Sequence, residues 1–224
     1  MRKTFILAAV LLMGVTIEIR AGRFIATPFA ETLNPGRSSI WQFGLYERKS
    51  SKDWRGLNRL DLGLAQGVEL GVFVISLKNK QADTWINLQY RPLKETHLIP
   101  ALAVGIWDVT RRGSWFLHQS AGPSPFVSLG KSVILGDRYA KAGVSYGFNR
   151  LNGFFAGGEI RFLKRTGILG EYIPKNSRLS KAGAMDIGLY QWLGKNWRLR
   201  VSSMGGNPMA DIFFTYVIGD QRAG

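Results

Sequence analysis

Residues 59–65 read Arg-Leu-Asp-Leu-Gly-Leu-Ala, and this stretch decides the fold class. Leucine occupies every second position, and the positions between the leucines carry a cation, a carboxylate and small residues. In a β-strand, successive side chains point to opposite faces, so a period of two separates the leucines from the charges. The stretch therefore predicts a strand with one apolar face and one polar face.

The same alternation recurs along the chain, in residues 41–46, 86–91, 141–148, 153–162 and 197–202. Beyond the N-terminal 21 residues, no segment shows the 3.6-residue apolar stripe of an amphipathic helix. We predict an all-β protein with about twelve antiparallel strands, starting near residues 38, 57, 68, 84, 100, 125, 139, 153, 166, 181, 196 and 211. No linker divides them, so we expect one domain whose sheet closes on itself.

The composition of the polar face indicates which face points into the barrel. It combines Gly, Ala and Ser with charges of both signs, which fit and can pair inside a narrow lumen. The opposite face is nearly free of charge, as contact with lipid requires. We expect an up-and-down transmembrane β-barrel, with a soluble β-sandwich as the alternative. The charges expected in the lumen are Arg59, Asp61, Glu69, Arg91, Lys141, Glu159, Arg161, Glu171, Asp186, Arg198 and Arg200.

The lengths of the expected connections favour one orientation. Long connections over 48–56, 110–124, 173–181 and 203–210 alternate with tight ones over 66–67, 135–138 and 194–196. Outer-membrane barrels have long extracellular loops and short periplasmic turns. The tight connections are therefore expected on the periplasmic side. Five tryptophans near strand ends are expected in the aromatic girdles at the membrane interfaces, namely Trp54, Trp85, Trp107, Trp192 and Trp197.

The N-terminus predicts export. A basic start, Met1-Arg2-Lys3, precedes the apolar run TFILAAVLLMGV over residues 4–15. This is the pattern of a secretory signal peptide, and the run is too short to cross a bilayer as a helix. We predict a signal peptide over 1–21, a periplasmic segment over 22–37 that leads into the barrel, the barrel over 38–219 and a tail over 220–224. The expected location is the outer membrane.

The charge balance indicates anionic partners. The chain has 30 Lys and Arg against 15 Asp and Glu, with no Cys and two His. The lack of Cys excludes disulfides and thiolate chemistry, and we expect no metal and no cofactor. Nucleic acid is not an expected partner of an exported chain. Outer-membrane lipid, lipopolysaccharide and acidic polysaccharide are expected at a basic outer rim formed by Arg48, Lys49, Lys52, Arg55, Arg111, Arg112, Lys175, Arg178 and Lys181.

Two segments resemble a known family. Residues 25–36 (IATPFAETLNPG) are similar to the TP-x-A-E-x-L-x-x-G pattern of YjbH-like bacterial outer-membrane β-barrel proteins. Residues 166–172 (TGILGEY), followed by 186–189 (DIGL), resemble a recurring hairpin of that family. The resemblance implies a barrel associated with exopolysaccharide production or export. Phe29 and Leu33 are hypothesised to plug or brace the periplasmic mouth.

Other functions stay open at this point. His118 and Ser120 would share one strand face, and their spacing is similar to the His-x-Ser of PagL-type lipid A deacylases. A lipid A-modifying hydrolase with Ser120 as nucleophile and His118 as base is therefore one alternative. A soluble periplasmic β-protein that binds an acidic ligand is another. The leading hypothesis is a non-catalytic outer-membrane barrel that is structural or involved in exopolysaccharide production or export. Its lumenal carboxylates are expected to form ion pairs rather than act as acids and bases.

Overall fold

The computed structural model describes residues 29–30, 32–33, 38–48, 53–76, 82–109, 122–136, 138–149, 151–175, 183–204 and 206–217. The signal peptide expected over 1–21 and the tail expected over 220–224 lie outside these residues. In the described part of the chain, no helix is long and apolar enough to cross a membrane.

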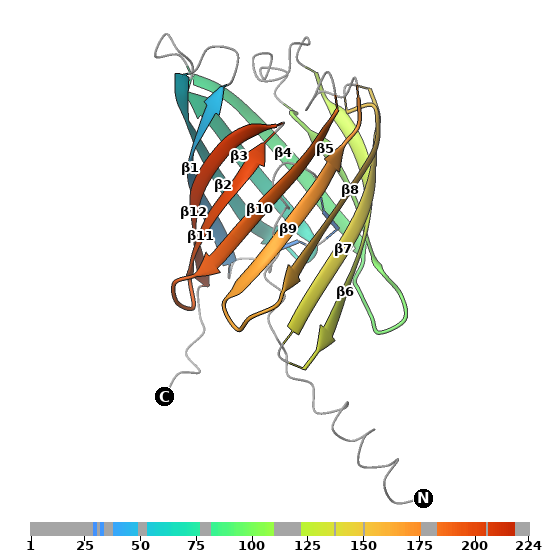
Figure 1. Ribbon diagram of the computed structural model, residues 1–224. Coiled ribbons are helices and arrows are strands. Elements are labelled where there is room, and N and C mark those ends of the chain that lie inside the picture. The colour runs from blue at the N-terminus through green and yellow to red at the C-terminus, as the bar shows by residue number, and fades with distance from the viewer. Residues whose placement is uncertain are drawn as a thin grey trace, which may run out of the picture.

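The strands form a single closed antiparallel sheet, in which each strand pairs with its neighbours in sequence and β1 pairs with β12 (Figure 1). The all-β, up-and-down barrel of about twelve strands is confirmed, and the β-sandwich alternative is wrong. The strands are β1 (Ser38–Arg48), β2 (Asp53–Ala65), β3 (Val68–Ser76), β4 (Ala82–Leu93), β5 (Ala101–Trp107), β6 (Ser124–Leu135), β7 (Arg138–Gly147), β8 (Gly153–Arg161), β9 (Thr166–Ile173), β10 (Ala184–Trp192), β11 (Trp197–Met204) and β12 (Asn207–Val217).

The two faces of the barrel wall separate as the alternation predicts. Trp41 and Phe43 of β1, Val144 of β7 and Leu199 of β11 are all exposed on the outside of the barrel. Charged and small residues between them point into the lumen and are mostly buried. A closed sheet leaves no strand edge unpaired, which a chain in lipid requires. The outward apolar face and the closed sheet together make this a transmembrane β-barrel.

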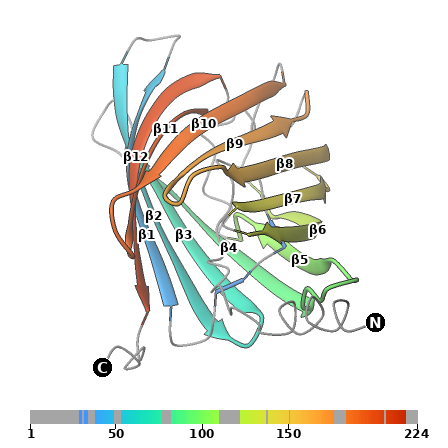
Figure 2. The same ribbon diagram turned by 60° about the horizontal axis from the view of Figure 1, so that its bottom comes forward.

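The two ends of the barrel differ in their connections. At the end where β1 begins and β12 ends, the connections are 66–67, 94–100, 136–137, 162–165 and 193–196, and we call this the short-turn end. At the other end they include 108–123 and 174–183, and we call it the long-loop end. One expected long connection, 203–210, is instead the tight turn 205–206, because β12 already begins at Asn207. Figure 2 views the barrel with the short-turn end brought forward.

The expected tryptophan girdle is partly wrong. Trp54 and Trp197 are exposed on the outside, but Trp85 and Trp107 are buried in the lumen. Trp192 is half-buried and lies on the inward face of β10. The reason is the period of the strand: Trp85 shares the inward face of β4 with Asn87 and Gln89. Proximity to a strand end does not decide the face.

Candidate functional site in the lumen

The lumen is the candidate functional site, because it collects the buried charges. Arg91, Arg161 and Arg198 are half-buried on the inward faces of β4, β8 and β11. The other expected lumenal charges are buried on the inward faces of their strands, namely Arg59, Asp61, Glu69, Lys141, Glu159, Glu171, Asp186 and Arg200. Their positions follow from the period of two, whereas their partners depend on strand register.

A buried ion pair lies next to the seam where the barrel closes. Arg200 of β11 and Asp211 of β12 are direct partners in the register. The Arg200 Nε donates a hydrogen bond to Asp211 Oδ1 at 3.0 Å, and its guanidinium also contacts Oδ2. Gln42 of β1 donates from Nε2 to the same carboxylate at 2.9 Å. One carboxylate thus joins the first strand of the barrel to the last two.

A second group of charges lies on β7, β8 and β11. Lys141 Nζ is 3.7 Å from Glu159 Oε2, and Arg198 Nη1 is 3.8 Å from the same oxygen. The hydroxyl of Tyr190 donates to Glu159 Oε1 at 2.9 Å. The Glu159 carboxylate therefore interacts with three side chains, those of Lys141, Tyr190 and Arg198. This agrees with the ion-pair interpretation of the lumenal carboxylates.

Aromatic rings and guanidinium groups lie together around this group. Arg198 Cζ is 5.3 Å from the centroid of the Tyr190 ring and 5.6 Å from that of Trp192. Arg161 Cζ is 5.6 Å from the ring of Tyr139, its register partner. Such distances suit cation–π attraction. We call this set of inward-facing residues the basic–aromatic cluster: Tyr139, Lys141, Glu159, Arg161, Tyr190, Trp192 and Arg198.

Residues before β1 fill part of the lumen. Phe29, Ala30, Thr32 and Leu33 are buried, and the backbone oxygen of Phe29 accepts a hydrogen bond from Gln89 Nε2 at 2.7 Å. We call the described residues 29–30 and 32–33 the plug segment. The contacts of Phe29 and Leu33 with inward-facing wall residues support the hypothesis that they fill the mouth of the barrel.

The wall is shaped to receive Phe29. A Cβ on Gly130 would lie 2.8 Å from Phe29 Cζ, and a Cβ on Gly143 would also collide with the ring. Lys141 Nζ lies 5.0 Å from the centroid of the Phe29 ring. Two glycines thus form a seat for the ring, and a lysine of the basic–aromatic cluster lies over it.

Leu33 is fixed by one polar and several apolar contacts. Its N–H donates to Glu69 Oε2 at 3.1 Å, and its side chain belongs to a buried cluster with Ile40 and Phe213. Glu69 therefore holds the plug segment. The sequence placed Glu69 in the lumen but gave no signal for this role, because the contact joins residues 36 positions apart.

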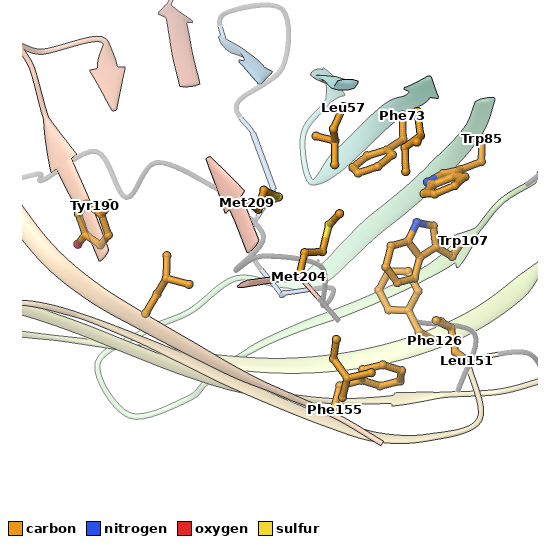
Figure 3. Packing of buried hydrophobic residues seen from close by; sticks show 13 residues of the cluster. Leu57, Phe73, Trp85, Trp107, Phe126, Leu151, Phe155, Tyr190, Met204 and Met209 are labelled. Carbon is orange, nitrogen blue, oxygen red and sulfur yellow. The ribbon is translucent and has the colours of Figure 1, made fainter. Parts of the chain in front are cut away.

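Large apolar side chains occupy the long-loop half of the lumen, a feature that the sequence analysis missed. Figure 3 shows them converging from several strands. The rings of Phe73 and Trp85 stack with centroids 4.8 Å apart, and the ring of Phe126 lies where a Cβ on Gly105 would collide with it. The packed set continues through Leu169 to Tyr190 of the basic–aromatic cluster. We call its other members the apolar lumen cluster: Leu57, Phe73, Ile75, Trp85, Trp107, Phe126, Leu151, Phe155, Ile173, Met204 and Met209.

The expected outer rim can be placed only in part. Arg55 was expected there but is buried, because it shares the inward face of β2 with Leu57 and Arg59. Lys175 is exposed just beyond β9, at the long-loop end. The side chain of Arg48 and all of Lys49, Lys52, Arg111, Arg112, Arg178 and Lys181 lie outside the described residues.

The catalytic candidates fall outside the described part of the chain, and that part contains no candidate metal site. His118 and Ser120 lie outside it, so the hydrolase alternative stays a prediction. Among the described residues, no group of three or more His, Cys, Asp or Glu could hold a metal ion.

The closed twelve-strand sheet and its outward apolar face define a transmembrane β-barrel. No family model and no curated protein matches the chain. Among solved structures it is similar to the KdgM porin, with a TM-score of 0.53 and 16% identity over 81% of this chain and 99% of that one. It is also similar to the KdgM porin in complex with disordered oligogalacturonate, with a TM-score of 0.52, 15% identity and the same coverage. At these identities the likeness establishes the fold.

Proposed function

We propose that the protein is a non-catalytic outer-membrane β-barrel of YjbH-like type that takes part in the production or export of an acidic exopolysaccharide. Its short-turn end would face the periplasm, as in other barrels with short periplasmic turns. The resemblance of residues 25–36 and the porin fold support this proposal, and the basic–aromatic cluster is the observation that carries it.

The cluster has the chemistry to bind a sugar acid. Lys141 and Arg198 lie within 4 Å of Glu159, the one carboxylate of the cluster, and Arg161 adds a third positive charge, so the cluster has a net positive charge. Guanidinium groups form paired hydrogen bonds with carboxylates, and aromatic rings offer flat apolar surfaces for sugar rings. Arg161 and Trp192 are half-buried, whereas the side chain of Arg198 is 11% exposed and most of the lumenal charges are buried. Arg161, Trp192 and Arg198 lie near the short-turn end, where a ligand from the periplasm would arrive.

The filled lumen favours a binding role over free diffusion. The plug segment occupies the short-turn half, and the apolar lumen cluster occupies the long-loop half. The solved KdgM complex contains oligogalacturonate, which is an acidic oligosaccharide. We infer that this chain contacts an acidic glycan of the same chemical class at its periplasmic mouth.

The test is a binding titration of the purified chain in detergent with oligogalacturonate and with an uncharged oligosaccharide of equal length. Arg198→Gln and Arg161→Gln should each weaken binding of the acidic sugar about tenfold, since a hydrogen bond to a charged group contributes about 1.5–3 kcal/mol. Arg165→Gln is the matched control, because Arg165 is exposed on the turn that follows β8.

Two results would contradict the proposal. The first is equal affinity of the unaltered chain for the acidic and the uncharged sugar. The second is unchanged affinity in both lumenal variants.

A further inference from the structure

The short-turn end of the barrel carries exposed apolar side chains on three of its connections or beside them. Leu98 is 85% exposed, Leu163 is 59% exposed and Leu193 is 57% exposed. Leu93 and Phe162 are also exposed at this end. Side chains of this kind, repeated around one end of a barrel, need an apolar surrounding.

Basic side chains lie on the same three turns and beside the turn 136–137. They are Lys94, Arg138, Lys164, Arg165 and Lys195, and all are exposed. Among the described residues of these connections, Glu95 is the one carboxylate, and Lys131 lies 3.5 Å from it. Asp137 lies outside the described residues. We call the five basic residues and the apolar residues beside them the turn rim.

The longest connection at this end, 94–100, is held in place against β6. Lys131 Nζ donates to the backbone oxygens of Thr96 and His97, at 2.5 and 2.8 Å. Glu95 Oε1 accepts a hydrogen bond from the N–H of Ser132 at 2.7 Å. Pairing between β5 and β6 ends at Gly130, so this carboxylate covers a part of β6 that β5 does not reach. Leu98 is thus presented by a fixed loop.

The outer wall next to the turn rim already has the features of a membrane interface. Trp197, Phe214 and Tyr216 lie on the outward faces of β11 and β12 near the short-turn end, with ring centroids 4.5 and 6.3 Å apart. Aromatic rows of this kind mark the headgroup level of a transmembrane barrel. The turn rim continues this surface beyond the strand ends.

We propose that the turn rim binds anionic phospholipid headgroups of the adjoining leaflet, with its basic side chains on the phosphates and its leucines among the upper acyl carbons. A soluble polyanion would satisfy the cations but would leave the exposed leucines in water. A lipid interface satisfies both, and long basic side chains reach from an apolar surface to the headgroups. The expected basic rim lay at the long-loop end, so this site is a different one, and it does not depend on the proposed function.

The first experiment counts lipids bound to the full chain by native mass spectrometry. Delipidated protein is titrated with phosphatidylglycerol and with phosphatidylcholine. The unaltered chain should bind phosphatidylglycerol at least tenfold more tightly, since each basic residue near an anionic surface contributes about fivefold. The variant K94Q/R138Q/K164Q/R165Q should lose this preference, and equal binding of both lipids by the unaltered chain would overturn the proposal.

A control variant removes positive charges at the other end of the barrel. The variant K78Q/K80Q/R150Q alters residues of the connections that join β3 to β4 and β7 to β8. It should keep the preference for phosphatidylglycerol. If it loses the preference as fully as the turn-rim variant does, overall charge is responsible and the turn rim is not the site.

A second experiment does not rely on a fourfold variant that could fail to fold. The chain has no Cys, so a single spin label can be attached at Leu98→Cys in phosphatidylglycerol vesicles. The label should be relaxed more by oxygen, which partitions into lipid, than by a water-soluble nickel chelate. Leu129→Cys on the outer wall and Gln66→Cys in an exposed turn are the lipid and water references. A Leu98 label that behaves like Gln66, or is shielded from both agents by protein, contradicts the proposal.

Discussion

The ring of Phe29 packs against two glycines of the barrel wall, which have no side chain in its way. The ring lies against Gly130 and Gly143, and the three nearest atoms to a Cβ on Gly130 all belong to the plug segment. Close packing of this kind makes even one methyl group costly. The contact therefore offers a direct test of whether the plug segment is part of the folded core.

Gly130→Ala should destabilise the barrel by about 1–3 kcal/mol through overpacking against Phe29. Phe29→Ala should cost about 3–5 kcal/mol, because it leaves a cavity in the lumen. In the double variant, the new methyl group occupies part of that cavity, so the total should be smaller than the sum. Denaturant unfolding of the three variants in lipid vesicles measures this coupling, and strictly additive losses would show that the two residues do not touch.

The Arg200–Asp211 pair is the most deeply buried ion pair among the described residues, and both side chains are fully buried. Asp211→Leu would leave the guanidinium without its carboxylate, at a cost of about 3–5 kcal/mol. Arg200→Met combined with Asp211→Leu removes both charges and should recover most of that loss. Unfolding free energies of the single and double variants decide this, and a double variant no more stable than the single one would count against it.

At the scale of elements, the β6–β7 hairpin extends past its neighbour β5. Lys131 to Leu135 of β6 pair with β7, whereas pairing with β5 stops at Gly130. The loop 94–100 takes the place of the missing strand through the Glu95 carboxylate and the N–H of Ser132. The Glu95 side chain thus accepts a hydrogen bond from β6 beyond the point where the backbone of β5 stops pairing with it.

Glu95→Ala should therefore expose the Ser132 amide to exchange. We expect at least a tenfold faster hydrogen–deuterium exchange at that amide, since loss of its acceptor lets water in. The Arg91 amide, which donates to the Gly67 oxygen at 2.7 Å, is the control and should not change. An unaltered rate at Ser132 would mean that other contacts protect this edge.

At the scale of the whole molecule, the lumen is filled from both ends. The plug segment, which is hydrogen-bonded to Glu69 and Gln89, occupies the short-turn half of the lumen. Stacked rings such as those of Phe73 and Trp85 occupy the long-loop half. A twelve-strand barrel lies between barrels of about eight strands, which side chains fill, and those of about sixteen, which leave an aqueous channel, so its inward side chains decide how open it is. The molecule is therefore built differently from a wide diffusion pore.

The full chain in a planar bilayer should show few or no ion-conductance steps. Removing residues 22–33 should open the short-turn half of the lumen. Trp85→Ala combined with Trp107→Ala should open the long-loop half. Each change alone should leave conductance low, because the two closures act in series, and the combination should produce clear steps. Steady large conductance of the unaltered chain would contradict a filled lumen.

Much of the barrel could be predicted because it depends on a local rule. In residues 59–65 the alternation alone assigns each side chain to the wall or to the lumen. The starts of most strands were predicted to within a few residues, and β2 and β12 each begin four residues earlier than expected. Trp85 was assigned to the girdle by its nearness to a strand end, although the alternation with Asn87 and Gln89 places it on the inward face. The end of β5, where Ile106 and Trp107 are adjacent, is apolar on both faces. In such a stretch the pattern does not indicate which side chains point into the lumen.

The sequence by itself determined the all-β class, the outward apolar face and the charged lumen, since a period of two acts on each strand separately. The tertiary structure alone decided which inward residues meet. Closure brings Gln42 of β1 to Asp211 of β12, and it places Phe29 against glycines more than a hundred positions away. Such partners depend on strand register around the whole barrel, and no local pattern in the chain specifies them.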